Sequence, residues 1–254
     1  MDHVTSTDGT RIAFDRTGTG PALVMVVGAF CTRLTTKTLT AVLADAYTVY
    51  EYDRRGRGES GDAALYSVES EFDDLAAIIA QAGGSAFVYG HSSGAALALG
   101  AAAHGVRMRK IAVYEPPFFP GQPAPGAFTQ EVCELLASGD REEAALRFIV
   151  NTGAPREAAE NLKNAPFWPN MLAIAHTLPY DLTLSDLGAI TLDWTAGIPE
   201  PILALSGGKS ADWAPNAARL IAAMAPDARA SVIEGQDHGV SDEALAPVLT
   251  QFFV

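Results

Sequence analysis

The sequence predicts an α/β fold in which a mostly parallel β-sheet carries helices on both faces. Short apolar runs recur along the chain and helical patterns fall between them. Such runs are typical of strands buried on both faces of a sheet. The chain has 254 residues, 48% of them apolar, which is enough for one large domain with a sizeable core. The expected strands are residues 22–27, 47–52, 86–89, 110–114, 202–205 and 230–233.

The remaining elements follow from local patterns. Asp8 and Gly9 separate two alternating runs, residues 3–7 and 10–16, which predicts a β-hairpin at the N-terminus. Apolar residues at three- and four-residue spacing predict helices between and after the strands, and Gly83-Gly84 ends the first of them. These helices are expected over residues 67–82, 93–104, 212–224 and 242–253.

One long segment interrupts the alternation of strands and helices. Residues 118–190 contain no convincing strand, and a Pro/Gly-rich stretch at their start leads away from the sheet. Helical stretches follow near residues 127–137, 140–151, 155–164 and 167–178. We therefore expect a helical cap formed by residues 118–190, inserted into a core formed by residues 1–117 and 191–254.

The pattern G-x-S-x-G occurs at residues 90–94, which read GHSSG. A short apolar strand is expected before it and an Ala-rich helix after it, which is the context of a nucleophile elbow. There a sharp turn raises the central residue at the carboxyl edge of the sheet, so Ser92 is the candidate nucleophile. The alternative is a glycine-rich turn in which Ser92 only caps a helix.

A serine hydroxyl needs a base to take its proton. Five histidines are available, and His238 follows the last expected strand directly, at the same edge of the sheet as Ser92. We therefore predict that His238 is the base, the alternative being a surface loop histidine.

Several motifs together resemble those of the α/β-hydrolase superfamily over nearly the full chain. They are VVGAF after the first core strand, YDRRGRGES after the next, GHSSG, and EGQDHG near the end. The resemblance implies an α/β-hydrolase fold, a catalytic triad and no cofactor. It also implies an acid in the loop after residues 202–205, commonly as G-x-x-D, but there this chain reads GGKS and has Ser210.

Two carboxylates are candidates for the displaced acid. Glu115 ends the strand that follows the elbow helix, beside the expected position of Ser92, and a charged group there requires a partner. Glu115 is our preferred acid, because zearalenone-type lactonases, which this chain resembles locally, have a glutamate at this place. Asp212 is the alternative, although its position before a helix is typical of an N-cap. A third possibility is that no carboxylate completes the site.

The oxyanion hole requires two backbone N–H donors. One should come from Ser93, the residue after the nucleophile. By resemblance to related enzymes, the other should come from the loop after residues 22–27, where Ala29 is the preferred donor and Gly28 the alternative.

Aromatic side chains are candidates for the walls of a substrate pocket. Phe30 follows the predicted oxyanion loop, and Phe119 and Trp168 lie in the expected cap. Phe118 and Phe167 are further candidates from the same segment. Each of these residues could instead be an ordinary core residue.

Composition and motifs disfavour several other functions. The chain has 17 basic and 30 acidic residues and no basic stripe, so neither nucleic acid nor an anionic membrane is an expected partner. Gly208-Lys209-Ser210 lacks the earlier glycine of a phosphate loop, and the histidines show no metal-ligand spacing. We expect a cytoplasmic monomer or homodimer without a metal or cofactor.

The sequence thus predicts a serine hydrolase that cleaves a small-molecule ester or lactone through Ser92, His238 and Glu115. A second hypothesis is a cofactor-free lyase or cyclase that uses the same triad. A third is a ligand-binding protein on the same fold without turnover.

Overall fold

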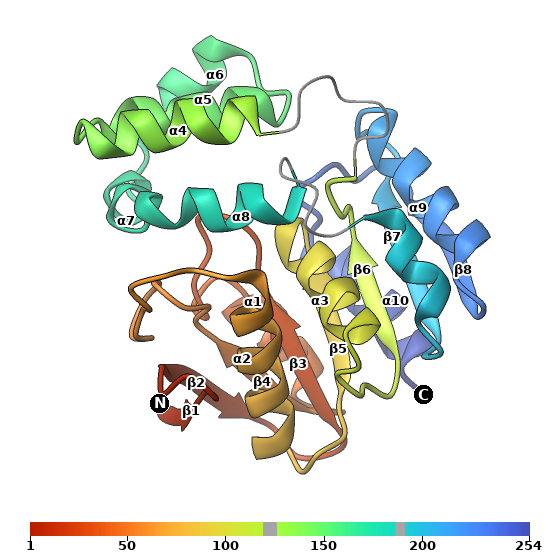
Figure 1. The fold of residues 1–254 in the computed structure, drawn as a ribbon. Helices are drawn as coiled ribbons and strands as arrows, with labels where there is room; N and C mark the ends of the chain where they lie inside the picture. The colour runs from red at the N-terminus through yellow and green to blue at the C-terminus, as the bar shows by residue number, and fades with distance from the viewer. Residues whose placement is uncertain (119–125, 186–190) are drawn as a thin grey trace.

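The structure is a computed structural model that describes residues 1–118, 126–185 and 191–254. Its centre is an eight-stranded sheet with the order β1-β2-β4-β3-β5-β6-β7-β8 (Figure 1). The strands are β1 (Asp2–Thr5), β2 (Arg11–Thr17), β3 (Ala22–Val26), β4 (Thr48–Tyr52), β5 (Phe87–His91), β6 (Ile111–Tyr114), β7 (Ile202–Gly207) and β8 (Ala228–Ile233). The predicted α/β fold and its mostly parallel sheet are confirmed.

The order of the strands determines where a site can form. β1 and β2 form the predicted N-terminal hairpin, β2 pairs antiparallel with β4, and the pairs from β4 through β3 to β8 are parallel. The chain runs outward from β3 to β4 and then returns to the other side of β3 with β5. Ligands of open α/β sheets bind at such a reversal, outside the carboxyl ends of the strands. Here those ends belong to β3 and β5.

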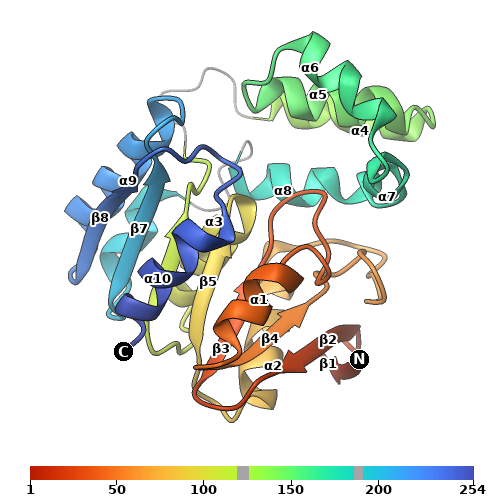
Figure 2. The same ribbon diagram turned by 180° about the vertical axis from the view of Figure 1, so that it is seen from behind.

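Helices cover both faces of the sheet and build two separate cores. One face packs against α2 (Val68–Gln81), α3 (Ser93–Ala103) and α9 (Trp213–Met224). The opposite face, seen in Figure 2, packs against α1 (Lys37–Leu43) and α10 (Asp242–Phe252). The strands of this sheet therefore need apolar side chains on both faces, which explains their continuous apolar runs.

The helices between β6 and β7 gather above the carboxyl ends of the strands (Figure 1). They are α4 (Ala127–Ala137), α5 (Arg141–Asn151), α6 (Arg156–Asn161), α7 (Trp168–Ala173) and α8 (Leu178–Ser185), with short 3-10 helices at Leu162–Asn164 and Ala175–Thr177. A third 3-10 helix, Leu192–Gly197, lies against α3 and α9 on the face of the sheet. The described part of residues 118–190 contains no strand, as the sequence predicts. Of the helices α4 to α8, α8 lies against α3, at the carboxyl end of β5.

Two elements differ from the sequence-based expectation. The helix expected over residues 167–178 is broken into α7 and a 3-10 turn, and a further helix, α8, begins only at Leu178. Helix α1 was not expected, because its sequence KTLTAVL is short and rich in threonine, a poor helix former. It is held by burial of Leu39 and Leu43 against the sheet. Among the described residues, no helix is both long and apolar enough to cross a bilayer.

Candidate active site

The turn between β5 and α3 holds Ser92 in a left-handed backbone conformation, with φ at 55°. The neighbouring glycines allow this turn to be tight. A Cβ atom on Gly94 would lie 2.2 Å from the carbonyl oxygen of Val26, and one on Gly90 would lie 2.6 Å from the Cα of Ala95. Any side chain at either position would therefore push α3 away from the sheet. The turn has the strained backbone and the close packing of a nucleophile elbow.

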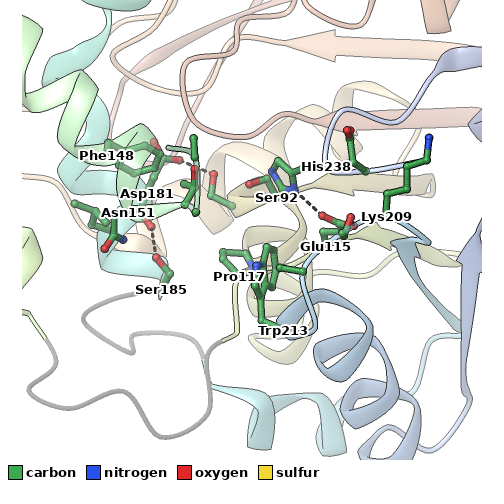
Figure 3. Close-up of a pocket in the computed structure, with 18 residues that line it drawn as sticks. Ser92, Glu115, Pro117, Phe148, Asn151, Asp181, Ser185, Lys209, Trp213 and His238 are labelled. Carbon is green, nitrogen blue, oxygen red and sulfur yellow. Dashed lines mark hydrogen bonds and ion pairs between the residues drawn. The ribbon is translucent and has the colours of Figure 1, made fainter. Parts of the chain in front are cut away.

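Glu115 and His238 are joined directly. The Nδ1 atom of His238 lies 2.7 Å from Oε2 of Glu115, whose side chain is fully buried, whereas the side chain of His238 is 47% exposed. The other carboxylate oxygen, Oε1, accepts hydrogen bonds from the backbone N–H of Gly207 at 2.8 Å and the hydroxyl of Ser210 at 2.5 Å. In Figure 3 the hydroxyl of Ser92 lies beside the imidazole of His238.

These contacts keep Glu115 ionised. Burial by itself raises the pKa of its carboxyl group, but the hydrogen bonds from His238, Ser210 and Gly207 outweigh burial and hold the pKa below its usual range. A carboxylate at Nδ1 places the ring proton on that nitrogen and leaves Nε2 of His238 as the basic atom.

Neighbouring side chains support the loop that carries His238. The hydroxyl of Tyr114, the residue before Glu115, donates to the backbone carbonyl of Asp237 at 2.5 Å. The half-buried ring of His91 lies 5.1 Å from the ring of His238, and its Nδ1 atom lies 3.2 Å from the hydroxyl of Tyr89. Burial, with a smaller effect of the nearby His238, lowers the pKa of His91 to about 3, so His91 is a much weaker base than an ordinary histidine.

The alternative acid, Asp212, is not among the residues that line the cavity beside Ser92. It is exposed, and it stands at the N-cap of α9 without a side-chain capping hydrogen bond. The N-cap interaction that its position suggested is therefore absent. Ser210, at the place where the superfamily motif has its aspartate, instead donates its hydrogen bond to Glu115.

The two predicted oxyanion donors come from two segments, the start of α3 and the loop after β3. Ser93 is the first residue of α3, where backbone N–H groups have no partner within the helix. Ala29 lies in the loop after β3, next to Gly28. A Cβ atom on Gly28 would lie 3.0 Å from the Cβ of Ser92, so glycine lets this loop approach the nucleophile without a tight contact.

A buried group of charges behind this loop was not identified from the sequence. Asp181 on α8 contacts Arg54, Arg57 and Ser93, and Arg54 also forms an ion pair with Glu71. One signal was present in the sequence, because YDRRGRGES places three arginines directly after a buried strand of an acidic chain. The sequence does not show which carboxylates form ion pairs with these arginines.

A cavity of about 480 Å³ opens beside Ser92 (Figure 3), a volume typical of small-molecule sites. Its walls come from both the sheet edge and the helices above it, and apolar surface predominates. Several wall residues were not singled out from the sequence, because their position depends on how the helices pack. These are Pro117, Phe148, Asn151, Leu182, Ser185 and Trp213.

The predicted wall aromatics take different places. Phe30 packs edge-to-face against Phe148, with ring centroids 5.5 Å apart, and so supports a wall residue. Trp168 is buried in a hydrophobic cluster between α5 and α6, a core position, and Phe118 is buried in the main core. Phe119 lies outside the described residues. Substrate contact by Phe30, Phe119 and Trp168 stays a prediction.

Within the described residues, no group of three or more histidine, cysteine or acidic side chains has the arrangement of a metal site. Lys209, at the end of the apparent phosphate-loop motif, is an exposed residue at the edge of the cavity. Its backbone N–H donates to the carbonyl of Gln236, which ties its loop to the one that carries His238.

Comparison with known proteins identifies the family. The model of the alpha/beta hydrolase family matches residues 23–250, which is most of the chain. The chain therefore belongs to the alpha/beta hydrolase family, and its mostly parallel sheet flanked by helices is that of this fold. Comparison with the curated proteins gave no match.

Several solved structures are similar to this chain over nearly its full length. An alpha/beta hydrolase from Sphaerobacter thermophilus is 44% identical, with a TM-score of 0.94 and full coverage of both chains. An esterase from Rhodococcus sp. is 20% identical, with a TM-score of 0.76 over 99% of this chain and 97% of that one. The enol-lactonase from Burkholderia xenovorans is 17% identical, with a TM-score of 0.78 and 99% coverage of each chain. The last two likenesses concern the fold alone.

Proposed function

We propose that the chain hydrolyses carboxylic esters or lactones of small molecules, with Ser92 as nucleophile, His238 as base and Glu115 as acid. The observation that carries this proposal is the 2.7 Å contact between His238 and the buried carboxylate of Glu115, on an imidazole that lies beside Ser92 (Figure 3). A serine, an imidazole and a carboxylate in this order form the machinery of acyl transfer on several unrelated folds.

In the first half of the reaction, Oγ of Ser92 attacks the ester carbonyl while Nε2 of His238 takes the hydroxyl proton. The carbonyl oxygen becomes an oxyanion, which the N–H groups of Ala29 and Ser93 stabilise. Glu115 stabilises the imidazolium that forms. The tetrahedral intermediate then collapses, the bond to the leaving oxygen breaks, and His238 returns its proton to the leaving alcohol.

In the second half, a water molecule gives its proton to His238 and attacks the acyl-enzyme. The carboxylic acid leaves, and the proton on His238 returns to Oγ of Ser92. A lactone follows the same steps, except that the leaving hydroxyl remains part of the acyl chain and departs only when water has released the product. The chemistry requires no cofactor.

The helices above the sheet would select the substrate. We assign residues 118–190 to a cap and residues 1–117 and 191–254 to the core, because Phe148 on α5 and Leu182 on α8 form cavity walls above the sheet edge. With Pro117 and Trp213 on the core side, these side chains favour an apolar acyl group or ring. The esterase and enol-lactonase among the similar structures are consistent with this substrate class.

The proposal is tested with short p-nitrophenyl esters, such as the acetate and the butyrate. The wild-type protein should turn them over, with a rapid initial release of about one equivalent of p-nitrophenol where deacylation is slower than acylation. Ser92→Ala should abolish both signals while its far-ultraviolet circular dichroism stays that of the wild type. A lyase or cyclase that uses the triad only for proton transfer should give neither turnover nor burst.

A further inference from the structure

We propose that Asp181 is a positioning residue for the oxyanion hole, acting from the cap through Arg57 and Ser93 on both predicted donors. This inference rests on the proposed function and deepens it. Helix α8 would then help to position the catalytic groups as well as line the cavity. Asp181 does not react itself, because both of its carboxylate oxygens are already hydrogen-bonded to Arg54, Ser93 and Arg57.

Asp181 is the meeting point of three hydrogen bonds. Its Oδ1 atom accepts from Nη1 of Arg54 and from the hydroxyl of Ser93, each at 2.7 Å, and its Oδ2 atom accepts from Nη2 of Arg57 at 2.7 Å. The side chains of Asp181, Arg54 and Arg57 are at most 1% exposed. The carboxylate is thus held on both oxygens, which fixes its orientation.

The contact of Arg57 reaches the first donor. Its Nη1 atom donates to the carbonyl oxygen of Gly28 at 2.6 Å. That carbonyl and the N–H of Ala29 belong to one peptide group, which is planar and rotates as a unit. A guanidinium at the carbonyl end therefore fixes the direction of the Ala29 N–H and polarises it, because hydrogen bonds in a chain strengthen one another.

The contact of Ser93 reaches the second donor. Ser93 supplies its backbone N–H to the proposed oxyanion hole, while its hydroxyl donates to Asp181. Asp181 thus ties the first residue of α3 to the same carboxylate that orients Arg57. The side chain of Asp181, which belongs to the cap, therefore fixes the positions of both backbone donors.

The charges of this cluster balance. Arg54 and Arg57 face Asp181 and Glu71, and Arg54 binds Glu71 through two hydrogen bonds of 2.6 Å. Buried ion pairs often contribute little net stability relative to apolar residues of the same volume, so stability alone is a weak reason for this arrangement. Of the described residues, none accepts a hydrogen bond from the buried Nε atom of Arg57. The guanidinium therefore keeps its hydrogen bonds to Gly28 and Asp181 even though this orientation leaves Nε without a partner.

The test compares Asp181→Asn with Glu71→Gln. Each change removes one buried carboxylate charge that pairs with Arg54 and conserves the shape of the side chain, but Glu71 touches neither donor of the oxyanion hole. Four quantities are measured on each full-length variant: kcat and KM for a p-nitrophenyl ester, the melting temperature, and Ki for a trifluoromethyl ketone, which forms an oxyanion on the serine.

We expect Asp181→Asn to lower kcat by roughly 30-fold or more, with KM changed by less than about threefold, since a lost oxyanion donor costs about 100-fold. Its Ki for the ketone should rise by the same factor as kcat/KM falls, because both report binding of the oxyanion. Glu71→Gln should lower the melting temperature comparably but keep kcat within about threefold of the wild type.

Equal activity losses in both variants would assign Asp181 a purely structural role and overturn the inference. A wild-type kcat in Asp181→Asn would also overturn it.

If Asp181→Asn does not fold, Ser93→Ala is the deciding variant, because it deletes one contact of Asp181 and keeps the backbone donor. Its kcat should fall by about tenfold or more, the value of one hydrogen bond to a charged group, and an unchanged kcat would overturn the inference. A wild-type protein without esterase activity would instead refute the proposed function together with this inference.

Discussion

Ser92, Glu115 and Phe30 each have a positive φ angle, which residues with a side chain rarely adopt. Their φ angles are 55°, 49° and 59°, and they are the non-glycine residues with positive φ in the described parts of the chain. Each follows the carboxyl end of one of the neighbouring strands β5, β6 and β3. Such strained positions cluster at functional sites, where the surrounding structure holds them. Here they coincide with the proposed nucleophile, its acid and the oxyanion loop.

The choice of the acid is tested by substitution. Glu115→Ala should lower kcat by about 100-fold or more, because His238 then loses both its orientation and the charge that stabilises its imidazolium. Asp212→Ala should leave kcat within about twofold of the wild type, because Asp212 is exposed and outside the cavity wall. Steady-state kinetics with a p-nitrophenyl ester measure both. Small and equal effects would remove Glu115 from the triad.

Ser210 is expected to assist Glu115 without being essential. Ser210→Ala deletes one hydrogen bond to the carboxylate and keeps those from Gly207 and His238. We expect kcat/KM to fall by about tenfold, which corresponds to a hydrogen bond of about 1.4 kcal/mol to a charged group. Ser210→Thr, which retains the hydroxyl, should recover most of the activity. If the alanine and threonine variants behave alike, the hydroxyl has no part in holding Glu115.

At the scale of elements, strand β6 organises the site. Its last residue, Tyr114, and the next residue, Glu115, both hold the loop of His238, one through the backbone of Asp237 and the other through the ring. On its other side, the carbonyl of Tyr114 accepts from the N–H of Ser92 at 2.9 Å. The carboxyl end of β6 therefore positions both the proposed nucleophile and the proposed base. This explains how the proposed acid can follow β6 instead of β7.

The close approach of α3 to the sheet yields a prediction about stability. Gly94→Ala should lower the melting temperature strongly or prevent folding, because the new methyl group would overlap the backbone of Val26. Gly197→Ala is the matched control, since a Cβ atom there has open space and the residue is not in the left-handed region. Thermal unfolding of both variants measures the difference. A Gly94→Ala protein as stable as the control would show that the elbow is not tightly packed.

Sequence patterns predicted the elements that repeat a regular period and missed those that tertiary packing holds. Strands β3 to β7 and the helices α2, α3, α9 and α10 follow from apolar runs and from spacing. Helix α1 and the separate helix α8 do not, because neither has a pattern strong enough to stand without its neighbours. Glu115 and His238 could be predicted because parallel strands bring their carboxyl ends to one edge. Asp181, Phe148 and the contact of Ser210 could not, because they depend on packing between distant segments.

At the scale of the whole molecule, stability should fall in acid. Burial by itself raises the pKa values of Glu115 and Asp181, but hydrogen bonding to His238 and the charge of Arg57, respectively, outweigh it, so both pKa values lie below their ordinary 4.5 and 3.8. Between the folded and unfolded pKa values the unfolded chain binds more protons, so the free energy of unfolding rises with pH. This stabilisation is complete above about pH 5 and is lost as the pH falls through the lowered values.

Urea unfolding at about pH 7, 5 and 3.5 measures this dependence, and the midpoint should be lowest at about pH 3.5. Burial raises the pKa of Asp74, which acts in the opposite direction but is a single group. Asp181→Asn should show a smaller decrease between about pH 5 and pH 3.5, because one of the contributing carboxyl groups is gone. A midpoint that stays constant or rises in acid would contradict the ionised state assigned to these buried carboxylates.

The account depends most on the reactivity of one hydroxyl. Treatment with a fluorophosphonate, followed by mass spectrometry of the intact protein and its peptides, measures that reactivity directly. The account predicts one adduct per chain, on Ser92, formed far more slowly in His238→Ala and not at all in Ser92→Ala. A folded wild-type protein that stays unlabelled, or that carries the adduct on another residue, would contradict it and would favour a ligand-binding role for this cavity.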